Sequence, residues 1–215
     1  TDLGNPSSRF KDLYLSGTAN ATGLSVDGGT IKLDGNYPTG TENVALGDTA
    51  LDSVESGGVW NVAIGSKALT ALTTGDANTA VGRVAMESAT TGGNNTALGY
   101  AALNANTTAS NNTAVGHLAL SANTTGANNV AIGKDALDSN TTASNNVAIG
   151  VDALQTNTIG AESVAIGTFA LNAQNPASAQ SMYNVAVGHN SGASVTTGTR
   201  NTIVGGLAGD ALTTG

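Results

Sequence analysis

The chain of 215 residues contains no cysteine, three prolines and very few aromatic side chains, which make up 3 % of the sequence. The absence of cysteine excludes disulfide frameworks and cysteine-rich zinc sites. Charged residues make up 10 % of the chain, whereas ordinary soluble domains contain about 25 %. A core of large aliphatic and aromatic side chains is therefore not expected, and neither is a conventional enzyme domain.

Positive charge is especially scarce, because seven Lys and Arg residues face fifteen Asp and Glu residues and the net charge is −8. Nucleic-acid binding depends on Lys and Arg side chains that neutralise phosphates, so no nucleic-acid partner is expected. The sequence also lacks any run of 18 apolar residues. We therefore expect no membrane insertion.

Small and polar residues are abundant instead. Ala (35), Thr (30), Gly (29) and Asn (24) together supply 118 of the 215 residues, or 55 %. Disordered chains combine low hydrophobicity with high charge, whereas 40 % of these residues are hydrophobic and few are charged. The bias therefore favours an ordered, repetitive structure.

A motif of Asn, Val or Thr, Ala, an aliphatic residue and Gly occurs ten times. The copies start at positions 43, 61, 78, 95, 112, 129, 146, 163, 184 and 201, with Ser163 replacing the Asn of the eighth copy and Ile203 the Ala of the last. Successive starts lie 18 residues apart once, 17 apart six times, then 21 and 17 apart. Such a regular interval indicates one structural unit per repeat.

Each unit predicts a short β-strand, because β-branched residues are enriched in strands. A second apolar pair, Ala then Leu, follows in most copies, as at Ala68-Leu69, and predicts a second short strand. Helical repeats need roughly 33 to 47 residues per unit, and Asn and Gly have poor helix propensity. The sequence therefore predicts an all-β fold, a parallel β-solenoid with coils of about 17 residues.

The two sides of the predicted strand differ in size. The second and fourth motif residues are bulky and share one side, whereas the Ala and Gly on the other side are small and leave room for a closely approaching backbone. One coil of this length encloses a thin core, which would leave the Ala/Gly side or the Leu side poorly buried. Association of several chains is expected to cover that side.

The repeated Asn-Val-Ala-Ile-Gly unit, as at Asn129 to Gly133, resembles the head repeats of trimeric autotransporter adhesins. The resemblance covers Asn43 to Gly215 and implies a left-handed β-roll assembled as a homotrimer, intertwined or side by side. The coil is a few residues longer than the usual adhesin repeat, so a longer outer turn is expected. The longer unit from Asn112 to Asn128 is similar to repeats of phage tail fibres, as is the segment from Arg9 to Thr18.

Two regions depart from the repeat. Residues 1–42 lack the period and are interpreted as a β-rich N-terminal connector, which leaves residues 43–215 as the ten-repeat shaft. The stretch from Asn175 to Tyr183 contains Pro176 and the four-residue insertion, so it is predicted to be a loop that projects from the rod.

The opening Asn residues are predicted to stack into a ladder in which each amide bonds to the next. Contact of this row with glycans is the alternative, and the repeat-ending Gly residues belong to the same structural framework. The predicted ladder residues are Asn43, Asn61, Asn78, Asn95, Asn112, Asn129, Asn146, Asn184, Asn201, Gly47, Gly65, Gly82, Gly99, Gly116, Gly133, Gly150, Gly167, Gly188 and Gly205.

No set of nucleophile, base and acid can be assembled from the repeat, so we predict no enzymatic activity, no catalytic residue, no metal site and no cofactor. His117 and His189 both follow a repeat Gly, where the residue type varies as it does in exposed turns. Rows of Thr-Thr pairs raise ice binding as an alternative, and exposed aromatics such as Trp60 and Tyr183 raise sugar stacking. The favoured interpretation is that the histidines and Thr pairs lie in solvated turns and that the aromatics are scattered surface residues.

The expected function is that of an extracellular structural fibre: the trimeric shaft of a phage tail fibre, which positions a receptor-binding tip for host attachment. Its expected partners are further copies of itself, other fibre or virion proteins, and a cell-surface glycan or protein receptor. The alternative is the head of a trimeric adhesin on a bacterial surface, which binds host or matrix ligands directly.

Overall fold

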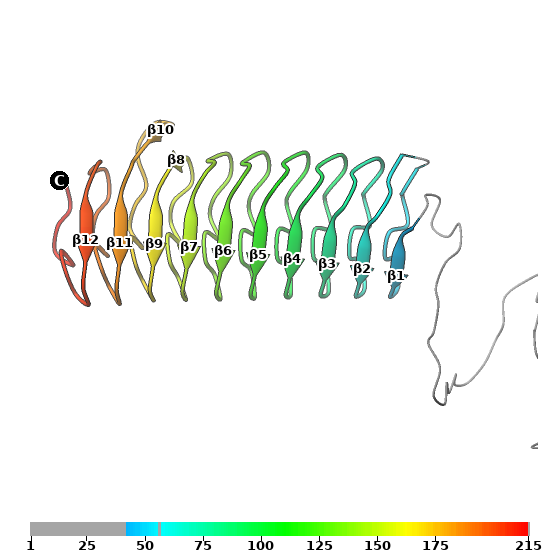
Figure 1. Cartoon of the computed structure of the whole chain (residues 1–215), viewed down its shortest axis with the longest axis horizontal. Helices are drawn as coiled ribbons and strands as arrows, with labels where there is room; N and C mark the ends of the chain where they lie inside the picture. Colours follow the sequence, from blue (N-terminus) through cyan, green and yellow to red (C-terminus); the bar gives the residue numbers. More distant parts are fainter. Residues whose placement is uncertain (1–41, 56, 215) are drawn as a thin grey trace, which may run out of the picture. The chain divides into compact units, whose positions relative to one another are not determined.

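The computed structural model describes residues 42–55 and 57–214, so the predicted connector over residues 1–42 lies almost entirely outside the described part. The described chain is all-β and winds into a parallel β-solenoid of about nine turns, with about 17 residues in each coil. Figure 1 shows the strands side by side in sequence order. The fold class predicted from the motif spacing is confirmed in these respects.

Each coil contributes one strand of three residues to a single ten-stranded sheet. Its strands are β1 (Val44–Leu46), β2 (Val62–Ile64), β3 (Thr79–Val81), β4 (Thr96–Leu98), β5 (Thr113–Val115), β6 (Val130–Ile132), β7 (Val147–Ile149), β9 (Val164–Ile166), β11 (Val185–Val187) and β12 (Thr202–Val204). Equivalent motif residues pair in register, as Ala114 does with Ala131. The repeat interval therefore sets the strand register directly.

The small side of the strand faces the solenoid core, and the bulky side faces outward. The central Ala of the strand, such as Ala131, is fully buried in the solenoid core, and the flanking Val130 and Ile132 point outward and are partly exposed. The core is narrow because Leu side chains from the opposite side of the coil fill it, so only a small residue fits on the strand. The expectation that the Ala side needs another chain for its burial is wrong.

The predicted second strand is also wrong, because the Ala-Leu pair lies in a turn. The Leu residues of this turn have left-handed backbones, with φ of 53° at Leu69 and 52° at Leu120, and they are fully buried. The turns still bond from coil to coil, as the Leu103 N–H donates to the Ala119 carbonyl at 3.0 Å. Burial of the Leu side chain offsets the backbone strain of about 1–2 kcal/mol that a left-handed conformation costs.

The residue before each opening Asn is left-handed as well, at φ of 56° for Ala77 and 59° for Asn94. Asn tolerates this conformation better than other non-glycine residues. We expect Ala77→Asn to stabilise the protein by about 0.5–1 kcal/mol, since Ala77 is exposed and nothing must repack. Thermal unfolding measures the gain. Ala71→Asn, in the same coil but outside the left-handed positions, is the control, and an equal gain there would contradict the explanation.

The insertion lies where it was predicted. The short strands β8 (Gly160–Ala161) and β10 (Gln180–Ser181) pair in parallel, and the chain around β10 projects beyond the neighbouring coils in Figure 1. The predicted loop is thus present and is held at its returning end by this pair.

Candidate functional site

The predicted ladder glycines follow the sheet strands, and at all of them except Gly205 a Cβ would clash with the backbone of the next coil. Gly116 has φ of 140°, and a Cβ placed on it would lie 2.4 Å from the carbonyl oxygen of Gly133 in the next coil. Real Cβ atoms essentially never approach so closely. The glycines are therefore needed because the backbones of successive coils touch at this corner.

The opening Asn residues before Asn201 are buried, and they form a ladder that runs from Asn43 to Ser163 and resumes from Asn184 to Asn201, although its bonds differ from the expected amide-to-amide pattern. The regular bond joins the side-chain oxygen of one Asn to the backbone N–H of the next, as from Asn129 N–H to Asn112 Oδ1 at 2.9 Å. Amide-to-amide bonds also occur, for example from Asn95 Nδ2 to Asn78 Oδ1 at 3.1 Å. Because these side chains are buried, the ladder is not available for contact with glycans.

Each opening amide also fixes the far end of its own coil. Asn129 Nδ2 donates to the carbonyl of Ala143, fourteen residues later, at 2.9 Å. The same bond joins Asn112 to Gly126 at 2.9 Å. One Asn side chain therefore closes its own coil and holds the next coil in register.

A second ladder of buried amides was not predicted. It lies eleven residues after the opening residue and consists of Asn106, Asn123, Asn140, Asn157 and Gln174, all fully buried. Asn140 Nδ2 donates to Asn123 Oδ1 at 2.8 Å, and the Nδ2 of Asn123 donates to Asn106 Oδ1 at 3.1 Å. The signal was available in the sequence, because Asn occupies this position in four successive repeats.

The two ladders share one acceptor in each of the four coils that have Asn in the second ladder. The Ala143 carbonyl accepts from Asn129 at 2.9 Å and from Asn140 at 3.0 Å. Both lone pairs of this carbonyl are therefore used inside the core. In the earlier coils the residue eleven positions after the opening Asn is apolar, as at Leu72 and Ala89. The second ladder is therefore restricted to part of the solenoid.

The turn after the repeat Gly forms an exposed polar edge, as predicted for His117 and His189. Tyr100 stacks on His117, with ring centroids 5.3 Å apart, and the Arg83 guanidinium lies 5.8 Å from the Tyr100 ring centroid. His189 makes an edge contact with Phe169 instead. Because Tyr100 lies between His117 and Arg83 in the stack, its ring is engaged by these neighbours.

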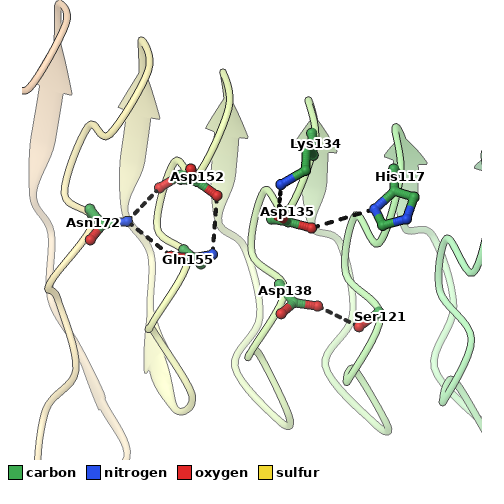
Figure 2. Close-up of polar contacts among 8 residues, drawn as sticks. All are labelled: His117, Ser121, Lys134, Asp135, Asp138, Asp152, Gln155 and Asn172. Atoms are coloured by element: carbon green, nitrogen blue, oxygen red, sulfur yellow. Dashed lines mark hydrogen bonds and ion pairs between the residues drawn. The ribbon is translucent and has the colours of Figure 1, made fainter.

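Figure 2 shows the polar contacts along this edge. Asp135 bonds to Lys134 and lies 3.7 Å from His117 Nδ1. Its carboxylate, first by the hydrogen bond and then by its charge, raises the pKa of Lys134 above the ordinary value. The Ser121 hydroxyl donates to Asp138, and Asn172 donates to Gln155 and to the Asp152 carbonyl. Apart from the Lys134–Asp135 pair, which lies within one coil, these contacts join neighbouring coils at the surface, where ion pairs contribute little stability.

The Thr-Thr rows divide into two roles. The first Thr of each pair donates to the next coil, as from Thr107 Oγ1 to the Thr124 carbonyl at 3.1 Å, so its hydroxyl belongs to the solenoid's own bonding. The second Thr, such as Thr108, is exposed. Trp60 and Tyr183 are exposed too, but Trp60 bonds to Glu42, and Arg200 lies 5.9 Å from the Tyr183 ring centroid.

The outer face of the sheet carries six of the twelve exposed large hydrophobic side chains of the described chain. It consists of the second and fourth motif residues of the ten sheet strands, and we call it the outer strand face. The members among the exposed large hydrophobics are Leu46, Ile64, Leu98, Ile132, Ile166 and Val204. Contiguous exposed apolar surface of this kind marks interaction sites.

The described residues contain no group of three or more His, Cys, Asp and Glu side chains placed to hold a metal ion. Over residues 42–55 and 57–214 there is also no helix with the length and apolar character needed to cross a bilayer. Comparisons with protein-family models, with curated proteins and with solved structures found no match to the chain.

Proposed function

We propose that this chain is the shaft of a homotrimeric extracellular attachment fibre, of the phage tail-fibre type, which holds a receptor-binding tip at a distance from the particle. The outer strand face carries the proposal. It places Val, Ile, Leu and Thr side chains on the outside of all ten sheet strands. Because the core is already filled by Ala and Leu, these outward apolar side chains become buried only when another surface packs against them.

Further copies of the same chain are the partners that fit this face best. Its residues repeat with the coil, so the faces of identical chains match strand by strand over the same length. β-branched and Leu side chains on flat sheet faces interdigitate when two such faces pack together. The number of copies, three, comes from the resemblance to trimeric adhesin heads and tail-fibre repeats.

The role is mechanical and not catalytic. Ladders of backbone bonds, buried amides and Thr hydroxyls run along the solenoid in parallel, as at Asn129, Asn140 and Thr124. Bending or stretching such a rod strains all of these ladders at once. The alternative is the head of a bacterial surface adhesin, which the Asn-Val-Ala-Ile-Gly motif supports equally.

Assembly is tested on the full chain by light scattering coupled to size exclusion. We expect a mass of three times 20.9 kDa for the unmodified chain and a shift towards the monomer for Ile132→Lys, because a charge would be buried without a partner. Val151→Lys is a matched control: Val151 and Ile132 are 39 % and 38 % exposed, but Val151 lies outside the outer strand face. Monomeric unmodified protein, or equal effects of both substitutions, would refute the assembly.

The attachment function is tested by immunogold electron microscopy of the culture that produces the protein. Gold particles along virion tail fibres are the expected result, whereas labelling of bacterial surfaces would establish the adhesin alternative. Labelling confined to the cell interior would overturn both.

A further inference from the structure

The coil that begins at Ser163 differs from its neighbours in three ways. It opens with Ser instead of Asn, it has Gln174 in place of the Asn of the second ladder, and it contains four extra residues. In the sequence, residues 175–178, Asn-Pro-Ala-Ser, match the Thr-Thr-Ala-Ser of residues 107–110, so deletion of residues 179–182 would restore the regular length. In the structure the extra residues lie before Met182, whose carbonyl accepts from the Arg200 N–H at 2.8 Å as the Ser110 carbonyl accepts from the Asn128 N–H at 3.2 Å.

The insertion removes the acceptor that an opening Asn requires. In the preceding coil, Asn146 Nδ2 donates to the Gly160 carbonyl, fourteen residues later, at 2.9 Å. The residue at this spacing after Ser163 is Ala177, which is exposed in the projecting segment. An amide at position 163 would thus be buried without this bond, and a shorter hydroxyl side chain stands there instead.

Gln174 makes the connections that the missing amide would otherwise provide. Its Nε2 donates to Asn157 Oδ1 at 3.2 Å, which continues the second ladder. Its Oε1 accepts from the Ser163 hydroxyl at 3.2 Å and from Asn184 Nδ2 at 2.9 Å. Because Gln is one methylene longer than Asn, this one side chain connects the second amide ladder to the ladder of opening residues.

The loop is anchored at both ends of the insertion. Pro176 and Met182 are buried, and a Cβ placed on Gly160 would lie 3.1 and 3.0 Å from their side chains. The Met182 N–H donates to the Ala161 carbonyl at 2.8 Å, next to the pairing of β10 with β8. Residues 177–180 between these anchors are exposed.

We propose that Ser163 and Gln174 are paired positioning residues that allow the loop of residues 175–183 to project from the solenoid as a fixed display element. They keep both amide ladders satisfied while the chain leaves the core and returns. The inference concerns the coil itself and does not depend on the proposed attachment function.

Four chains test the pairing: the unmodified chain, S163N/Q174N, deletion of residues 179–182, and the deletion combined with S163N/Q174N. Hydrogen exchange at β9 and β11 is the readout, and exchange at β3 and β4 checks that each chain has folded. With the loop present, we expect the Asn pair to lower protection by about tenfold or more, because buried amides lose their partners. In the deletion background the Asn pair restores a regular coil, and protection should be equal or higher. An effect of the same sign and size in both backgrounds would overturn the proposal.

Limited proteolysis supplies a second test that does not depend on the double variant. Gln174→Asn shortens the connecting side chain by one methylene, and we expect cleavage within residues 175–183 to accelerate by about tenfold. Gln155→Asn makes the same chemical change on a half-buried Gln whose amide donates to Asp152 at the surface. Equal cleavage rates in the two variants would show that Gln174 does not hold the loop.

Discussion

Gly116→Ala is expected to unfold the middle of the solenoid, although it adds only one methyl group to the chain. A backbone at φ of 140° strains any residue with a side chain by about 1–3 kcal/mol, and the new Cβ also meets the Gly133 carbonyl carbon at 2.6 Å. That carbonyl belongs to the backbone of the next coil, so the ladder must separate. Thermal unfolding, together with hydrogen exchange of the Gly116 and Gly133 amides, measures the effect.

Gly205→Ala is the matched control, because φ is 128° there but a Cβ would meet only Ala208, at 3.7 Å. It carries the backbone strain without a clash between coils. The difference between the two variants therefore isolates the close approach of coil to coil. Losses of equal size would show that backbone conformation alone explains the glycine.

Asn129→Leu is expected to have the second largest effect, although Leu and Asn have similar shapes. The substitution leaves the buried Asn146 N–H without the acceptor that it has at 2.9 Å. It also removes the bond from the side chain to the Ala143 carbonyl at 2.9 Å. An orphaned buried polar group costs about 1–3 kcal/mol, and denaturant unfolding would measure the loss.

Asn201→Leu provides the comparison, since Asn201 donates to Asn184 at 3.1 Å but accepts no hydrogen bond from a following coil in the described chain. We expect a smaller loss, from the amide donor alone. If Asn201→Leu proved as damaging as Asn129→Leu, the ladder's stabilising role would have to lie in the donated bonds.

The spacing of the motif was sufficient to predict the first strand of each unit, the coil length and the parallel register, but the second predicted strand is a turn. The period of two along a strand shows which residues share a side, such as Val130 and Ile132, but not which side faces inward. That choice depends on the width of the coil, which the Leu turns on the far side determine. The left-handed turn at Leu137 carries no local signal, because Leu has no preference for φ of 49°.

The amide ladders were predictable in part. The opening Asn row follows from repetition, but its main bond, from side-chain oxygen to backbone N–H, depends on the corner geometry at residues such as Asn112. The role of Gln174 could not be predicted from the sequence, since it arises from a missing amide at Ser163 and an insertion that follows Gln174 in the chain. Only the folded coil brings these departures together.

The shared sequence separation of nearly all the ladder bonds makes the length of this rod a heritable variable. Asn, Thr and backbone partners in the regular coils lie one repeat apart, as Asn129 does from Asn112 and Thr124 from Thr107. Duplicating or deleting a block of 17 residues gives every remaining group an equivalent partner and changes the rod by one strand spacing, about 4.8 Å. Unequal recombination between repeats of such a gene can therefore change the length of the solenoid while the packing of its core stays the same.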